Sequence, residues 1–225
     1  MLTVHHLNHS RSQRVLWLLE ELAVDYEIAH YERDKKTMLA PPELLAVHPL
    51  GKSPVITDGE HTVAESGAII EYVLDQYDAQ HHLRPAHGSD ALLQYRYWLH
   101  YAEGSAITPL LLQLVFERIS KPPMPLVMRP SAAIIAMGVK MSYIKPQIKK
   151  HLAFQEQTLN EQTWFAGAEF SAADIQMSFV IEAAHARGLI QQDYPQLNDF
   201  LNRIQARPAY QQALSRGGPY QLGQF

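Results

Sequence analysis

The sequence predicts a small mixed α/β domain followed by an all-helical domain. In about the first 77 residues, short strand-like runs and runs of helical period follow one another in the order βαβαββα. A polar stretch broken by Pro85 and Gly88 then interrupts the pattern. Beyond it, almost every segment has helical spacing. We therefore expect a first domain at residues 1–78, a linker at 79–89 and a second domain at 90–225.

The first domain is expected to hold four strands and three helices. Leu2–Leu7 begins with β-forming residues and ends at turn signals, which indicates a strand. Residues 12–24 place apolar side chains at helical spacing, with Ser10 or Ser12 available as the N-cap. The other expected elements are a strand at 25–31, a brief helix from the prolines at 41–42 to the residue before His48, strands at 53–57 and 61–65 around the turn Asp58–Glu60, and a helix at Ser66–Tyr77.

The second domain is expected to contain long helices with two proline interruptions. Pro109 and Pro146 lie inside helical patterns, so each predicts a kink. Ser171 precedes a later helix and Asp174 follows it three residues on, which is an aspartate version of the capping box. We expect Ser171 and Asp174 to be structural caps, whose loss affects folding more than chemistry.

Composition narrows the class of protein. Of 225 residues, 47% are hydrophobic and 19% are charged, which is typical of a folded chain, and no apolar run approaches the roughly 20 residues of a membrane span. The net charge of −4 does not indicate a nucleic-acid binder. The N-terminus does not have the pattern of a signal peptide, so we expect a cytoplasmic protein. There is no cysteine, which excludes disulfides and a mechanism based on the protein's own thiol.

The twelve histidines do not predict a metal centre. No two of them are spaced i, i+4 on a helix beside a carboxylate in a defined site. We therefore expect no metal and no tightly bound cofactor.

The stretch "VHPLGKSPVITDGEHTVAESGAIIEYV", residues 47–73, has two unusual features. Pro54 opens a predicted strand, although proline cannot donate to a sheet ladder. Glu65 stands directly before a predicted helix. From the residues alone, an edge-strand proline and an acid near a helix start explain both features.

Five segments in this order resemble the cytosolic glutathione S-transferase family, in the bacterial type with a serine in the active-site loop. They are "HSRSQRVLWLLEEL", "HPLGKSPVI", "ESGAIIEYV", "WFAGAEFSAADI" and "RPAYQQAL". The resemblance covers nearly the whole chain. It implies a thioredoxin-like first domain joined to a helical bundle, a homodimer, and conjugation of glutathione to electrophiles.

The resemblance also implies a glutathione site. In this family the proline that opens the third strand is cis, so Pro54 would turn the backbone of Ser53 toward the cysteinyl part of glutathione. Ser66 is expected to be the N-cap of its helix, whose N–H groups would bind the γ-glutamyl carboxylate. Glu65 would pair with the ligand's ammonium group and Lys52 with a glutathione carboxylate.

Activation of the thiol is expected at the start of the first helix. A hydroxyl donor there would stabilise the thiolate, which is the reactive form. Ser10 is our preferred candidate. Alignment through Arg14 places the serine or cysteine of several family branches on His9, one residue earlier. Asn8, His9 and Ser12 therefore remain alternatives, and Ser10 would then be only a helix cap.

The electrophile pocket is expected on the first helix of the second domain. Tyr101 and Ser105 share a helix face at i, i+4, and Trp98 lies one turn earlier, where packing in the bundle is the alternative. Glu103 would reach a partner subunit's ligand or face water. The expected partners are glutathione, a small hydrophobic electrophile and a second copy of the chain, with no nucleic acid and no membrane.

Two other functions remain open at this stage. Glutathione-dependent peroxide reduction would use the same site, because glutathione itself supplies both thiols. A protein that only binds hydrophobic ligands or interacts with partners would keep the fold without turnover.

Overall fold

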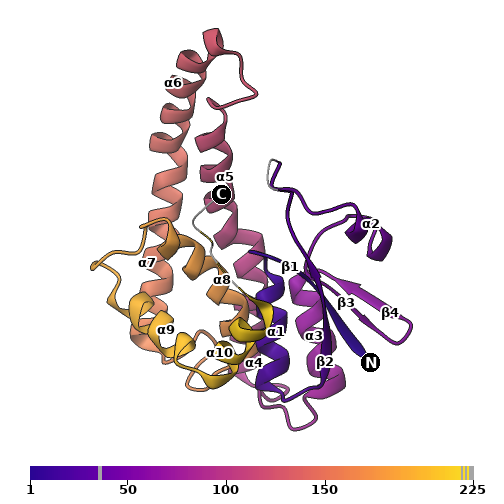
Figure 1. Ribbon diagram of the computed structural model, residues 1–225. Coiled ribbons are helices and arrows are strands. Elements are labelled where there is room, and N and C mark those ends of the chain that lie inside the picture. The colour runs from indigo at the N-terminus through magenta and orange to yellow at the C-terminus, as the bar shows by residue number, and fades with distance from the viewer. Residues whose placement is uncertain (35–36, 219, 221, 223–225) are drawn as a thin grey trace.

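The computed structural model describes residues 1–34, 37–218, 220 and 222. It confirms the predicted order of elements in the first domain and the helical second domain (Figure 1). The first domain contains β1 (Leu2–Leu7), α1 (Ser12–Glu21), β2 (Tyr26–Tyr31), α2 (Glu43–Val47), β3 (Val55–Asp58), β4 (His61–Ala64) and α3 (Ser66–Tyr77).

The four strands form one mixed sheet in the order β2-β1-β3-β4. β1 runs parallel to β2 and antiparallel to β3, so that Val4 pairs with Ile28 on one side and Ile56 on the other. Val4 and Ile56 are completely buried, as central strand positions should be. Helix α1 contacts β1, α3 and two helices of the second domain, so it lies where the two domains meet.

The second domain is entirely helical over its described residues. Its elements are α4 (Asp90–Tyr101), η1 (Ala102–Ala106), α5 (Ile107–Arg118), η2 (Leu126–Met128), α6 (Arg129–Val139), η3 (Lys140–Ile144), α7 (Lys145–Glu161), α8 (Ala172–Ala186), α9 (Pro195–Gln205) and α10 (Pro208–Gly217). In Figure 1, α5 and α6 extend away from the rest of this domain.

Both long helices contain a π-helical turn just before their proline. The turns η1 and η3 end three and two residues before Pro109 and Pro146. Proline has no N–H, and its ring clashes with the carbonyl four residues earlier, so a wider turn accommodates it. The interruptions that the prolines predicted are therefore local π turns.

The contact between α1 and α10 anchors the first domain on the second. The Trp17 ring meets Tyr210 edge to face, with centroids 5.1 Å apart. At Gly217 an added Cβ would lie 2.5 Å from Oε1 of Gln13 and 2.8 Å from Cδ1 of Leu16, so a larger residue here would require these two side chains to move. Helix α1 therefore packs closely against α10 of the second domain.

Only some of the helix caps predicted from the sequence are present in the structure. Oδ2 of Asp174 accepts hydrogen bonds from the backbone N–H and the hydroxyl of Ser171, at 2.9 and 3.1 Å. Burial raises the pKa of Asp174 to about 6, against these hydrogen bonds. The expectation that Ser66 is an N-cap is wrong: the N-cap is Glu65, and Ser66 is the first helical residue. The N-cap of α1 is Arg11.

None of the described helices has both the length and the apolar character that crossing a bilayer requires. Across the same described residues, His, Asp and Glu side chains do not gather in groups of three or more that could hold a metal ion.

Candidate active site

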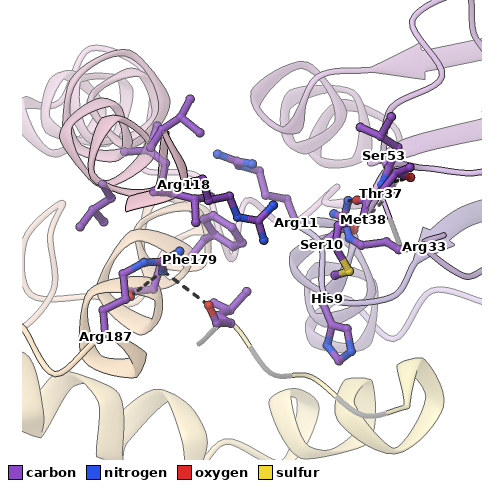
Figure 2. Close-up of a pocket in the computed structure, with 17 residues that line it drawn as sticks. His9, Ser10, Arg11, Arg33, Thr37, Met38, Ser53, Arg118, Phe179 and Arg187 are labelled. Carbon is purple, nitrogen blue, oxygen red and sulfur yellow. Dashed lines mark hydrogen bonds between the residues drawn. The ribbon is translucent and has the colours of Figure 1, made fainter. Parts of the chain in front are cut away.

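Two neighbouring cavities share Arg11 and Ser53. The first, which we call the polar cavity, has a volume of about 220 Å³ and is lined by Arg11, His48, Leu50, Lys52, Ser53, Pro54, Ala64, Glu65, Ser66 and Glu103. The second, which we call the apolar cavity, has a volume of about 400 Å³ and lies between the domains (Figure 2). Its described lining is His9, Ser10, Arg11, Arg33, Thr37, Met38, Leu39, Ser53, Ile107, Leu110, Leu111, Leu114, Arg118, Phe179, Ala183, Arg187 and Leu222.

The polar cavity brings together all five residues predicted to bind glutathione. Lys52, Ser53 and Pro54 directly precede β3, and the Ser53–Pro54 peptide bond is cis. Glu65 and Ser66 stand at the start of α3. Glu65 has a φ of 73°, in the region that favours glycine, and such strain is concentrated at functional sites. The cavity thus combines a cation, a carboxylate and the N-terminus of a twelve-residue helix.

Three serine hydroxyls meet at the boundary of the two cavities. Oγ of Ser10 lies 2.7 Å from Oγ of Ser12 and 3.3 Å from Oγ of Ser53, and it accepts a hydrogen bond from the N–H of Ser12 at 3.1 Å. The hydroxyl of Ser53 donates to the carbonyl of His5 at 3.1 Å. Since Ser53 uses its own proton there, Ser10 is the donor in the contact between them.

The hydrogen-bonded series from Ser10 through Ser12 ends at His6, inside the protein. Oγ of Ser12 lies 2.9 Å from Nδ1 of His6 and donates to the carbonyl of Leu7 at 3.3 Å. Burial, followed by the charge of His30, lowers the pKa of His6 to about 4, so the ring is neutral at pH 7. The proton of Ser12 therefore points inward, and the proton of Ser10 is the one that can turn to the cavity.

The structure separates the four candidates for thiol activation. Ser10 and His9 line the apolar cavity, and His9 has a φ of 52°. Ser12 is fully buried behind Ser10. The amide Oδ1 of Asn8 accepts the backbone N–H of Arg33 at 2.9 Å, which fixes Asn8 to the segment after β2.

Arg11 is a site residue that the sequence analysis missed. Its Nε donates to Oε1 of Glu103 at 2.6 Å, and its guanidinium lies 4.3 Å above the centre of the Phe179 ring. Glu103 thus pairs within its own chain. No local pattern marks an arginine at a helix N-cap as functional, so only its place between two serines of a proposed site gave any signal.

A buried ion pair behind the site was also missed. Arg14 on α1 pairs with Glu182 on α8 and donates to the hydroxyl of Tyr220 at 2.7 Å, while the hydroxyl of Tyr210 donates to Glu182 at 2.6 Å. Burial opposes a charge on Arg14, but the carboxylate of Glu182 raises the pKa of the guanidinium above its usual value. The signal in the sequence was a single acid, Glu182, within the apolar run of α8.

The predicted electrophile pocket is not brought to this site. Trp98 is 1% exposed and stacks on Phe154, with ring centroids 5.2 Å apart. The hydroxyl of Tyr101 lies 2.6 Å from Nδ1 of His151, and burial raises the pKa of Tyr101 to about 12. Tyr101 and Ser105 line a separate surface depression, and none of the three is among the described residues around the apolar cavity.

A different part of the same helical segment faces the apolar cavity. Ile107, Leu110, Leu114 and Arg118 on α5 line it, at spacings that form one helix face. Trp98 and Tyr101 lie on α4 and Ser105 lies within η1, so the predicted residues precede this set along the chain. Residue spacing alone does not show how far along the helical segment the apolar cavity lies.

Known proteins match the chain over both domains. Models of the glutathione S-transferase N-terminal and C-terminal domains match residues 1–75 and 139–208. Glutathione S-transferase 1 of Saccharomyces cerevisiae is 34% identical, over 93% of this chain and 92% of the relative. Glutathione S-transferase 3 of Schizosaccharomyces pombe is also 34% identical, over 93% of this chain and 85% of the relative.

A solved structure matches in fold as well as in sequence. A glutathione S-transferase from Actinobacillus pleuropneumoniae has a TM-score of 0.83 and 33% identity, and the match covers 100% of this chain and 97% of that one. This chain therefore belongs to the glutathione S-transferase family and is a glutathione transferase, which uses glutathione as its co-substrate.

Proposed function

We propose that this enzyme joins the thiolate of glutathione to a small hydrophobic electrophile held in the apolar cavity. The observation that carries this proposal is the junction of the two cavities. A hydroxyl, Ser10, and a cation, Arg11, lie where a thiol bound in the polar cavity would face the apolar one.

Glutathione would bind along the polar cavity. The backbone of Ser53, ahead of β3, pairs with the cysteinyl part like one rung of an antiparallel ladder. The N-terminus of α3 at Ser66 favours the γ-glutamyl carboxylate, and Glu65 receives the ammonium group. Lys52 neutralises a carboxylate. All four residues line this one cavity, which supports the assignment.

The thiol would be activated by an exchange of hydrogen bonds. In the free enzyme the proton of Ser10 is directed to Ser12 or Ser53. When the thiolate forms, Ser10 turns and donates to sulfur, and this charge-assisted hydrogen bond favours the anion. The thiol proton passes to water. The sulfur lone pair then forms the bond to the electrophilic carbon, and the leaving group departs with its electron pair.

Substitution of Ser10 tests this role. Ser10→Ala removes the charge-assisted hydrogen bond to the thiolate, which is stronger than the neutral hydrogen bond that Ser10 makes in the free enzyme. The pKa of the bound thiol should therefore rise by about one unit. The rate of conjugation to 1-chloro-2,4-dinitrobenzene should fall roughly tenfold near pH 7 and recover in alkaline solution. His9→Ala, the other cavity-lining candidate, should keep the parent's pH profile. The opposite result would assign activation to His9.

One binding measurement and two activity measurements separate the proposed conjugation from peroxide reduction and from ligand binding without turnover. Titration calorimetry with glutathione, conjugation of an aryl halide and reduction of cumene hydroperoxide are measured on one preparation. Conjugation faster than peroxide reduction supports the proposal. Faster peroxide reduction favours the peroxidase, and glutathione binding with neither activity favours the binding protein.

We also propose a two-fold homodimer in the cytoplasm. The first domain of one subunit would contact the helical domain of the other. Leu93 and Tyr97 on α4 are 66% and 45% exposed, which suits a covered surface. Sedimentation at micromolar concentration should give a mass about twice 25.6 kDa, and a single-chain mass would overturn the dimer.

A further inference from the structure

Among its described lining residues, the apolar cavity has several basic side chains and no acidic one. Four arginines line it: Arg11, Arg33, Arg118 and Arg187. None of the described residues around it is Asp or Glu. Arg11 is neutralised from the adjoining polar cavity by Glu103. The lining would therefore repel cations and attract anions in a partly enclosed space, where charge acts more strongly than in open water.

Arg187 follows the end of α8 and is held in place by backbone carbonyls. Its Nη1 donates to the carbonyl of Ala183 at 3.0 Å and to that of Leu222 at 3.5 Å. Within the part of the chain that the structure describes, no carboxylate lies within ion-pair distance of it. Glu182, five residues earlier, is already paired with Arg14 and Tyr210.

Arg118 faces the cavity from the last turn of α5. It is exposed, and among the described residues it too has no carboxylate partner. The neighbouring acid, Glu117, accepts a hydrogen bond from Gln113 at 2.9 Å. In Figure 2, Arg118 and Arg187 lie on the helical side of the cavity, across from Ser10 and Ser53. The two cations are therefore placed opposite the proposed position of the thiolate.

The rest of the lining is suited to an apolar body. Leu110 and Leu114 on α5 and Phe179 on α8 contribute side chains, and the volume of about 400 Å³ is in the range of small-molecule sites. An uncharged electrophile would fill this space and leave both guanidinium groups without a negatively charged partner among the described residues. A ligand with one anionic end would bury its body here and accept charge-assisted hydrogen bonds from the planar arginine forks.

We propose that the preferred electrophile is an amphipathic anion, with a carboxylate or sulfonate bound by Arg118 and Arg187 and its reactive carbon turned toward Ser10. This inference rests on the proposed conjugation and narrows its substrate class. With an aryl chloride of this kind, the glutathione sulfur bonds to the ring carbon, the carbon–chlorine bond breaks, and chloride leaves with the electron pair. The thiol proton passes to water.

Two substrates that differ at one end, where one carries a charge, test the proposal. They are 4-chloro-3,5-dinitrobenzoate and its methyl ester. Because the ester group activates the ring more strongly than the carboxylate, each kcat/KM is divided by the rate constant of the uncatalysed reaction with glutathione, and on this scale the parent should show the higher value with the carboxylate. Arg118→Gln combined with Arg187→Gln should lower that value about tenfold, by loss of charge-assisted hydrogen bonds, and change the ester value less than twofold. Added salt should reduce the parent's preference.

Matched variants separate charge from folding. Arg129→Gln is the control, because Arg129 is also half-buried and also donates to a carbonyl, that of Met124 at 2.9 Å, but does not line the cavity. It should change neither substrate. Arg187→Lys keeps the charge without the planar fork and should fall between the parent and Arg187→Gln.

Binding without turnover provides a second measurement. The fluorescence of 8-anilinonaphthalene-1-sulfonate and of uncharged N-phenyl-1-naphthylamine reports on the same body with and without an anion. The double variant should weaken binding of the first about tenfold and leave the second unchanged. If neither substrate is turned over by the parent, the proposed conjugation fails, and this binding result decides the inference alone. Three results would each overturn the proposal. The first is a parent that prefers the ester. The others are a carboxylate preference or a sulfonate affinity that the double variant leaves unchanged.

Discussion

The two cavities differ in how the chain builds them. The polar cavity takes most of its lining from residues 48–66, inside one domain, and depends on backbone conformation at Ser53–Pro54 and at Glu65. The apolar cavity exists only where several distant segments meet: the loop before α1, residues 33 and 37–39 after β2, Ser53, helix α5, helix α8 with the residue after it, and Leu222. A change in the contact between the domains should therefore disturb the apolar cavity more than the polar one.

The largest expected effect comes from breaking the ion pair that joins α1 to α8. Arg14→Met leaves the carboxylate of Glu182 buried and unpaired, which should lower the free energy of unfolding by about 3–5 kcal/mol. Arg14→Met combined with Glu182→Gln removes the buried charge, so it should be more stable than the single variant by at least about 1 kcal/mol. Urea unfolding measures both. In the surviving fold, naphthalene-sulfonate binding should weaken more than glutathione binding, and equal losses would contradict the comparison.

The second largest effect should be confined to the polar cavity. Glu65→Gln with Ser66→Ala removes groups proposed to hold the γ-glutamyl end, and should weaken glutathione binding by about 2–4 kcal/mol. Calorimetry measures this loss, while binding of naphthalene sulfonate should not change. Glu60→Gln, at an exposed acid of the neighbouring hairpin, is the control. An equal loss in that control would show that the effect is general electrostatics.

The sequence predicted the residues of the polar cavity better than those of the apolar cavity. Ser53, Pro54, Glu65 and Ser66, which line one cavity, were predicted because turns and helix starts have local sequence signals and because the resemblance implies those positions. Of the residues that line the apolar cavity, His9, Ser10 and Ser53 were named from the sequence, but those on α5 and α8 were not. The position of a cavity along a helical segment depends on which distant segments pack against it, and the apolar spacing of the helix does not reveal this.

Long-range polar contacts were equally hidden from the sequence. Arg11 forms an ion pair with Glu103, which is 92 residues away in the sequence. Arg14 forms one with Glu182, which is 168 residues away in the sequence. Each arginine alone has an ordinary surface interpretation in the sequence. Only the packing of α1 against the second domain brings these charges together.

An effect of similar size that appears only in acid should come from His6, behind the serines. Its folded pKa of about 4 lies below the usual 6.5, so the unfolded chain binds more protons between these values. Its contribution to stability is therefore present above pH 6.5 and is lost as the pH falls toward 4. His6→Asn should reduce this acid-induced loss by about 3 kcal/mol, since each pKa unit corresponds to 1.36 kcal/mol.

Unfolding by urea at pH 7.0, 5.5 and 4.0 measures this difference. His87→Asn, at an exposed position before α4, should keep the parent's pH dependence. If His6→Asn also keeps the parent's pH dependence, then His6 does not supply the acid sensitivity. The neutral ring of His6 would then not explain why the proton of Ser12 points inward.

The smallest expected effect concerns the residues that the sequence placed at the electrophile. Tyr101→Phe removes a hydroxyl that contacts His151, so it should cost about 1 kcal/mol of stability. Because Tyr101 lies in a separate depression, kcat/KM for the aryl halide should change less than twofold. Leu114→Ala, within the apolar cavity, loses about 1 kcal/mol of apolar contact with the substrate and should lower kcat/KM roughly fivefold. A larger loss in Tyr101→Phe than in Leu114→Ala would move the electrophile to α4, and the two cavities would then no longer adjoin through the substrate.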